Sequence, residues 1–134
     1  MNYEPLIQSA RDSRDRALAV YSQFPVGAAL MTHDGTIYTG INIESSSYGL
    51  TCCAERVALF KALSEGERKF AAIAIAVSGE ELCPPCGACR QVLWDYTEDI
   101  DVILVADTPD VQELKLSQLF PYAFDKGFLD HEGR

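Results

Sequence analysis

Two short motifs contain residue types that can hold a metal ion and move protons. The first is Cys53–Arg56 (Cys-Ala-Glu-Arg), and the second is Pro85–Gln91 (Pro-Cys-Gly-Ala-Cys-Arg-Gln). A Cys-x-Glu sequence alone is common by chance, and a Cys-x-x-Cys sequence alone indicates either redox or metal chemistry. Because each motif stands at the expected start of a helix, the two together indicate one shared metal site.

The spacing of the sulfur ligands predicts where the ion lies. Cys86 and Cys89 are three residues apart, so they share one helical face and can bind one ion. Cys53 and Glu55 are two residues apart, about 200° around a helix, so both face one ion only if it lies beyond the helix end. We therefore expect the site where two helix N-termini meet. Three thiolates leave the fourth position of a tetrahedral zinc ion open for water, which is the catalytic pattern.

The neighbouring cysteines leave a second ligand set open. With Cys52 and Cys83, five thiols are available, which would permit a closed structural site of four cysteines. If Cys52 were the ligand, Glu55 would stand three residues after it instead of two. We therefore expect Cys52 and Cys83 to be packed thiols beside the site.

The charged residues of the motifs have two interpretations each. A carboxylate on an apolar helix needs a partner, so Glu55 either forms a buried ion pair with Arg56 or Arg90 or acts as a general acid and base at the metal. The second role is favoured, since Glu55 stands two residues from an expected ligand. Arg56 is expected to reach a cysteine sulfur and, with the two helix N-termini, to offset the negative charge of three thiolates. Its alternative is a salt bridge elsewhere.

Composition limits the class of protein. The 134 residues are 48% hydrophobic and 23% charged, which predicts a single globular domain over 1–134. The net charge of −9 disfavours nucleic acid as a partner, because phosphate backbones are also negative. No apolar run is long enough for a bilayer, and the N-terminus lacks the basic region of a signal peptide, so we expect no membrane contact and a cytoplasmic location. An odd number of clustered cysteines favours reduced thiols or metal ligands.

Hydrophobic patterning predicts alternating helices and strands. Alternation of this kind indicates a layered α/β sheet with crossover connections. The helix Cys53–Ser64 is apolar nearly all round and is therefore expected to be buried, and Cys86–Tyr96 has the pattern of a second buried helix. The expected helices are Pro5 to about Val20, Cys53–Ser64, Cys86–Tyr96 and Ser117–Phe120. The expected strands are Val26–Met31, Ile37–Ile43, Phe70–Val77, Val102–Ala106 and, at an edge, Glu113–Leu116.

The two motifs resemble those of the small zinc-dependent cytidine deaminases, a signature that the zinc deaminases share as a class. The similarity covers nearly the whole chain, including Tyr21–Ala29, Gly40–Glu44 and Leu119–Phe124. Val20 and Phe120 depart from the residues that this family often has, but both are apolar exchanges. The resemblance implies a three-layer α/β/α cytidine-deaminase-like fold with a five-stranded mixed sheet.

The resemblance also implies the reacting groups. Cys53, Cys86 and Cys89 would bind one zinc ion per chain, and Glu55 would carry protons. The reaction would be hydrolysis of cytidine, and of deoxycytidine, to uridine or deoxyuridine and ammonia, in pyrimidine salvage.

The substrate-binding residues are implied in the same way. Asn42 and Glu44 would hold the ribose hydroxyls, Phe24 would pack against the ring, and the Ala54 backbone would contact the base. Without the resemblance, Phe24, Asn42 and Phe124 would be ordinary strand or core residues.

The family is typically homotetrameric, which implies that neighbouring chains complete each site. Tyr48 and Phe124 would reach into the site of a neighbouring subunit. The alternative for both rings is that they cover their own core.

Three other functions stay open at this point. A deaminase of another aminopyrimidine such as blasticidin S is disfavoured by Asn42 and Glu44, which suit a ribose. A polynucleotide-editing deaminase is disfavoured by the acidic charge balance. A zinc-stapled structural module would not require Glu55 beside the metal.

Overall fold

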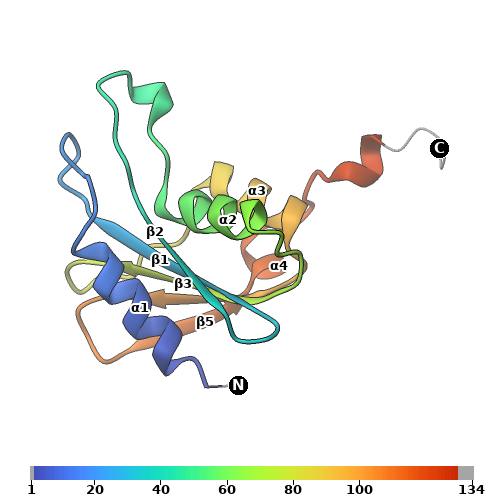
Figure 1. The fold of residues 1–134 in the computed structure, drawn as a ribbon, viewed down its shortest axis with the longest axis horizontal. Helices are drawn as coiled ribbons and strands as arrows, with labels where there is room; N and C mark the ends of the chain where they lie inside the picture. The colour runs from blue at the N-terminus through green and yellow to red at the C-terminus, as the bar shows by residue number, and fades with distance from the viewer. Residues whose placement is uncertain (1, 130–134) are drawn as a thin grey trace.

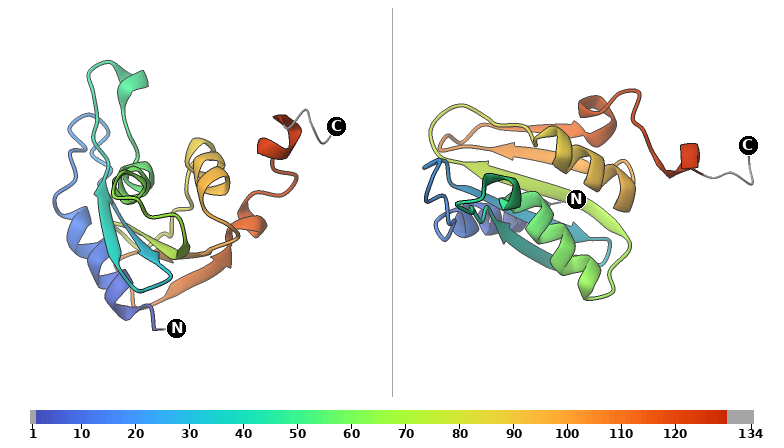
Figure 2. Two further views of the ribbon diagram at one scale, coloured as in Figure 1. Left: turned by 45° about the vertical axis from the view of Figure 1, so that its right-hand side comes forward. Right: turned by 90° about the horizontal axis from the view of Figure 1, so that it is seen from above.

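The computed structural model describes residues 2–129 and contains one mixed sheet between layers of helices. The strand order is β2-β1-β3-β4-β5. The strands are β1 (Val26–Thr32), β2 (Ile37–Ile41), β3 (Phe70–Val77), β4 (Asp101–Val105) and β5 (Val111–Lys115). Helix α1 (Glu4–Arg14) covers one face, while α2 (Ala54–Ser64) and α3 (Gly87–Tyr96) cover the other (Figures 1 and 2). The predicted three-layer α/β/α fold with a five-stranded mixed sheet is confirmed.

Three short elements complete the described part of the chain. They are η1 (Tyr48–Leu50), α4 (Leu116–Leu119) and η2 (Lys126–Leu129). The loop that carries η1 and the C-terminal segment that carries η2 both extend away from the body of the sheet (Figure 1). Within residues 2–129, no helix is both long enough and apolar enough to cross a membrane.

The topology brings the starts of α2 and α3 together. Strand β1 pairs antiparallel with both β2 and β3, so β2 and β3 run in the same direction. Because parallel strands end at the same edge of a sheet, the helices that follow them begin at that edge. Helix α2 follows β2 and α3 follows β3, and their N-termini therefore meet, as the motif spacing predicts.

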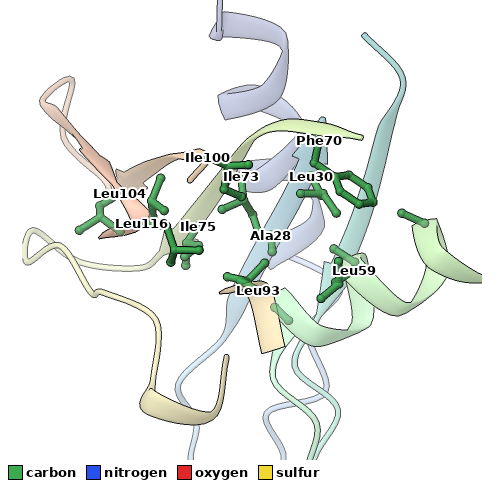
Figure 3. Close-up of a cluster of buried hydrophobic side chains, with 14 residues drawn as sticks. Ala28, Leu30, Leu59, Phe70, Ile73, Ile75, Leu93, Ile100, Leu104 and Leu116 are labelled. Atoms are coloured by element: carbon green, nitrogen blue, oxygen red, sulfur yellow. The ribbon is translucent and has the colours of Figure 1, made fainter. Parts of the chain in front are cut away.

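Alternation along the central strands divides the core in two. On β3, the isoleucines Ile73 and Ile75 face α2 and α3, in the cluster drawn in Figure 3. The alanines that alternate with them on β3 face α1, together with Ala29 and Met31 of β1. Large side chains on one face and small ones on the other let α1 lie close to the sheet.

Two glycines set how closely the helices approach the sheet. A Cβ at Gly40 of β2 would lie 2.2 Å from the Ala54 carbonyl oxygen and 2.5 Å from the Ala58 nitrogen, both in α2. A Cβ at Gly27 of β1 would lie 2.2 Å from the Ala10 carbonyl oxygen of α1. Gly40 therefore fixes the position of the helix whose first turn carries Glu55.

The first helix is shorter than predicted. It ends at Arg14 rather than near Val20, and Leu18 is 49% exposed beyond its end. Arginines in its last turns hold the end of the helix: Arg11 donates to the Ala106 and Thr108 carbonyls, and Arg14 to the Val77 carbonyl. The chain then leaves α1, and the Leu18 N–H donates to the Asn42 carbonyl.

The second strand is also shorter than predicted, and the last strands and helix shift by one or two residues. Strand β2 ends at Ile41, since Ile43 pairs only through isolated bridges to Leu18 and Cys52. The expected Val102–Ala106, Glu113–Leu116 and Ser117–Phe120 become Asp101–Val105, Val111–Lys115 and Leu116–Leu119.

The expectation that both motif helices are buried is wrong, because each is buried on one side only. On α2 the alanines at every fourth position are buried, but Phe60 on the outer face is exposed. On α3 only Cys89 and Leu93 are buried. The sides of α2 and α3 that face away from the sheet therefore stay open in the single chain.

Candidate active site

Three thiols converge where α2 and α3 begin. Cys53 is the N-cap of α2, Cys86 is the N-cap of α3, and Cys89 lies in the first turn of α3. The Cys53 and Cys86 sulfurs are 3.7 Å apart, and the Cys86 and Cys89 sulfurs are 3.5 Å apart. All three lie within 4.8 Å of one another.

This cluster fits a tetrahedral zinc ion. Zinc–sulfur bonds of about 2.3 Å in a tetrahedron require sulfurs about 3.8 Å apart, close to the spacing found. The pKa of the Cys53 thiol is lowered to about 5, by its contact with Cys89 and then by Arg56. A lowered pKa favours the thiolate of Cys53, which is the form that binds a metal.

The other two cysteines lie outside the cluster. The Cys52 backbone pairs with Ile43, and its side chain faces a different hollow, between β2 and α2. Cys83 borders the site, but its sulfur contacts the Pro84 carbonyl. Among the described residues, only the set of Cys53, Cys86 and Cys89 meets the geometry of a metal site.

Glu55 is buried beside the thiols, with only 5% of its surface exposed. Burial raises the pKa of its carboxyl group. None of the ion pairs within residues 2–129 includes it, because Arg56 donates to Cys53 and Arg90 donates to the Pro85 and Leu119 carbonyls. The ion-pair interpretation of Glu55 is therefore wrong; its carboxyl group interacts with the Cys89 thiol instead.

Arg56 reaches the metal ligands from the first turn of α2. Its Nη2 lies 3.4 Å from the Cys53 sulfur, while its buried Nε has no hydrogen-bond partner in the described part of the chain. The guanidinium and the two helix N-termini place positive charge around the sulfurs. This positive charge offsets part of the negative charge of three thiolates bound to one ion.

A cavity of about 260 Å³ opens beside Cys53, Glu55 and Cys86. This is close to the lower end of the usual range for small-molecule pockets, ~300–1,000 Å³. Its lining includes the sequence-predicted Phe24, Asn42, Glu44 and Ala54, and also Ser22, Val26, Thr51, Ile75, Cys83 and Pro84. The four residues expected to bind the substrate within one chain thus line the same cavity as Cys53 and Cys86.

Hydrogen bonds fix the polar end of this cavity. Asn42 is buried, and its side chain accepts from the Val26 N–H and donates to the Phe24 carbonyl. The Glu44 carboxylate accepts from the Tyr21 and Ser22 backbones and from the Ser22 hydroxyl. The bonds from Ser22 lower the pKa of Glu44, so this carboxylate is charged at neutral pH.

Two predicted residues lie away from the cavity. Tyr48 is 75% exposed on the η1 loop, where its ring contacts Tyr21 edge-on at 5.9 Å. Phe124 is 53% exposed and stacks on Phe128. Neither lines the cavity of its own chain. The alternative that they cover their own core is not supported, since both rings are largely exposed.

Ser22 and Thr51 are site residues that the sequence gives no reason to select. Ser22 is an exposed serine in a loop, and its hydroxyl contacts Glu44. The next residue, Gln23, has a left-handed backbone conformation, which the sequence does not reveal. Thr51 accepts the Ser45 N–H and borders the cavity. Only the resemblance of Tyr21–Ala29 to a known segment marks that loop as functional.

Comparison with known proteins gives one consistent result. The family model for the cytidine and deoxycytidylate deaminase zinc-binding region matches residues 1–105. A cytidine deaminase of Sporosarcina psychrophila is 46% identical over 132 residues, which cover 98% of this chain and 97% of that protein. One from Halalkalibacterium halodurans is 49% identical over 125 residues, covering 92% and 95%. The crystal structure of cytidine deaminase from Burkholderia pseudomallei matches with a TM-score of 0.88 and 45% identity, over 92% of this chain and 100% of that chain.

The fold and the three-thiol site are thus those of a metal-dependent hydrolase with an open coordination position. The chain belongs to the cytidine and deoxycytidylate deaminase zinc-binding family. Its cofactor is zinc, for which the cluster of Cys53, Cys86 and Cys89 has the donor atoms and the spacing.

Proposed function

We propose that the protein hydrolyses the 4-amino group of cytidine and deoxycytidine, giving uridine or deoxyuridine and ammonia. The observation that carries this proposal is Glu55, a buried carboxyl group without an ion-pair partner, in one cavity with the thiol cluster and two polar residues. The names of the relatives from Sporosarcina psychrophila and Halalkalibacterium halodurans support it.

The zinc ligands would be Cys53, Cys86 and Cys89, with one ion per chain. When bound, such an ion supplies Lewis acidity that makes a water molecule acidic near neutral pH. The positive charge of Arg56 preserves that acidity by withdrawing electron density from the Cys53 sulfur.

Glu55 would carry both protons of the reaction. It accepts a proton from the attacking water and delivers it to ring N3, which makes C4 electrophilic. After the oxygen bonds to C4, Glu55 moves the second proton from that oxygen to the amino group, which leaves as ammonia. A raised pKa suits this exchange, because the carboxyl group must both accept and release a proton.

Residues on the other side of the cavity would orient the substrate. Glu44 and Asn42 would hold sugar hydroxyls, Phe24 would pack against the ring, and the Ala54 backbone would contact the base. Their shared position in one cavity supports these roles.

Ammonia release by the purified, zinc-loaded protein tests the proposal. We expect turnover of cytidine and deoxycytidine, and little turnover of blasticidin S or of cytosines within an oligonucleotide. Preferred turnover of blasticidin S or of the oligonucleotide would replace the substrate assignment. Full zinc loading with no turnover of any substrate would favour a structural zinc module.

We also infer that the active assembly is a homotetramer in which Tyr48 and Phe124 act in a neighbouring site. Both rings are exposed on segments that extend from the body of the chain, and Phe60 leaves the outer face of α2 apolar (Figure 1). A well-placed ring gains about 0.5–1.5 kcal/mol against an aromatic base.

Two measurements test this assembly. Light scattering is expected to give about four times the 14.8 kDa chain mass. Mixing Phe124→Ala chains with Glu55→Gln chains is expected to restore activity, because some sites then combine an intact Glu55 with an intact Phe124. A fully active monomer would contradict the assembly and leave the zinc chemistry unaffected.

A cytoplasmic place in pyrimidine salvage completes the proposal. It is supported by the free cysteines, which metal binding requires in the reduced state. Release of uridine from a free nucleoside would suit such a role.

A further inference from the structure

The Glu44 carboxylate is held by one neighbouring segment of chain. Its Oε1 accepts the backbone N–H groups of Tyr21 at 2.9 Å and of Ser22 at 2.8 Å. Its Oε2 accepts the Ser22 hydroxyl, and Asn42 Nδ2 lies 3.4 Å away, beyond the usual hydrogen-bond length. Ser22 therefore supplies a bond to each oxygen of the same carboxylate.

This arrangement limits what else Glu44 can bind. An ionised carboxylate offers about four acceptor positions and no donor. Three are taken by Tyr21 and Ser22, and both positions on Oε1 are among them. About one position remains, on Oε2, and it accepts a donor such as a hydroxyl group.

The Ser22 hydroxyl has a second contact that reaches another part of the cavity. Because its proton goes to the acceptor-only carboxylate, its oxygen is free to accept, and the Phe24 N–H donates to it at 3.1 Å. The same hydroxyl thus connects Glu44, at the polar end of the cavity, to Phe24, an aromatic residue of its lining.

The backbone between these residues is held in an uncommon conformation. Gln23 has φ of 57°, in the left-handed region that residues other than glycine rarely adopt. Such conformations persist only where the surroundings over-determine them, and they concentrate at binding sites. Here the Ser22 hydroxyl on one side and the Asn42 amide, bonded to the Phe24 carbonyl, on the other hold the turn in place.

We propose that Ser22 is a positioning residue that orients Glu44 for a single sugar hydroxyl of the substrate and, through the Phe24 N–H, sets the position of the Phe24 ring. This rests on the proposed function, in which Glu44 binds the sugar. Ser22 acts through Glu44 and Phe24 and takes no part in the proton transfers.

The test compares two substrates on the same preparation of each variant. Cytidine carries the sugar hydroxyls, whereas 2′,3′-dideoxycytidine lacks the two that Glu44 could accept from. Losing a hydrogen bond to a charged group predicts that Ser22→Ala lowers kcat/KM for cytidine about tenfold, mainly through KM. A smaller loss is expected for dideoxycytidine, and Ser22→Thr, which keeps the hydroxyl, should restore the preference. The ratio of the two substrates does not depend on how much of the variant is folded.

Ser117 provides a matched control. Its N–H and hydroxyl bind the two oxygens of Asp99, each at 2.7 Å, which is the same pattern at the other end of the sheet. Ser117→Ala removes an equivalent bond outside the cavity, so it should leave the ratio of the two substrates at the parent value.

A double variant identifies the path through Glu44. In a Glu44→Gln background, Ser22→Ala should change the cytidine to dideoxycytidine ratio less than twofold. Equal losses on both substrates, or a full tenfold effect in the Glu44→Gln background, would overturn the positioning role. A parent enzyme that releases ammonia from neither substrate would overturn the proposed function and this inference with it. Parent turnover with an unchanged ratio in Ser22→Ala would overturn the inference alone.

Discussion

Gly40 gives the sharpest perturbation of the site from outside it. This residue lies in β2, beneath the first turns of α2, and the nearest atoms that a Cβ would meet belong to Ala54 and Ala58 of that helix. Gly40→Ala adds a single methyl group at the point where helix and strand are closest. The substitution therefore moves Cys53 and Glu55 without altering either one.

The size of the effect follows from the contacts. The new Cβ would lie 2.2 Å from the Ala54 carbonyl oxygen and 2.5 Å from the Ala58 nitrogen. Since non-bonded heavy atoms rest about 3.5 Å apart, α2 has to move outward by about 1 Å. Overpacking of this kind costs about 1–3 kcal/mol in the free energy of unfolding. A displacement of about 1 Å at reacting groups costs about 10²-fold in rate.

Gly27→Ala is the matched control. Its Cβ would lie 2.2 Å from the Ala10 carbonyl oxygen, so its clash is as severe, but it displaces α1 on the opposite face of the sheet. Urea unfolding measures the free energy of each variant, and initial rates of ammonia release measure kcat for the folded fraction. We expect both variants to lose stability, and only Gly40→Ala to lose about 10²-fold in kcat.

Two results would refute this reasoning. Parent-like stability of Gly40→Ala would mean that α2 is not held by its contact with β2. Equal kcat values for the two variants would mean that the position of α2 on the sheet does not control the geometry of Glu55.

The metal ligands, the sugar site and one surface ion pair each give a further prediction. Cys86→Ala should lose zinc by elemental analysis while Cys52→Ala keeps it, and the reverse result would make the ligand set wrong. Cytidine should exceed cytidine 5′-monophosphate at least tenfold in kcat/KM, because a phosphate near the Glu44 carboxylate is repelled by about 1–4 kcal/mol, and equal efficiencies would contradict the sugar assignment. Burial opposes the charge of Asp101, but hydrogen bonds from Lys115 and Tyr3 still lower its pKa below 3.8. The ion pair of Asp101 with Lys115 is partly exposed, so it should contribute under about 1 kcal/mol to the free energy of unfolding above pH 3.8. It should lose this contribution as the pH falls further and Asp101 is protonated. The difference in urea unfolding between parent and Asp101→Asn should therefore shrink in acid. A difference that grows in acid would contradict the lowered pKa.

The metal site could be predicted from the sequence because ligand chemistry depends on residue type and short spacing. The sequence puts Cys86 and Cys89 at the start of one helix, and Cys53 and Glu55 at the start of another. Few arrangements of these four residues bind one ion. The observed sulfur spacing agrees with that derivation. The order of helices and strands could be predicted for the same reason, since it follows from local periodicity.

The parts that could not be predicted depend on contacts between distant segments. Helix α1 ends at Arg14 because its arginines bind carbonyl groups of β3 and the end of β4, which no local pattern reveals. The composition of α2 and α3 shows that they are apolar, but not whether the sheet or another chain covers each face. Ser22 gives no signal at all, because its role arises from the fold of the loop around Glu44.

Glu55 is assigned the transfer of protons beside a zinc ion held by three cysteines. Glu55→Gln tests it most directly, because the amide keeps the shape of the side chain but cannot accept the proton. We predict a variant with the parent's zinc content and unfolding curve that loses about 10²–10⁴-fold or more in kcat for cytidine. A zinc-loaded, folded Glu55→Gln variant with activity within a few-fold of the parent would contradict the account.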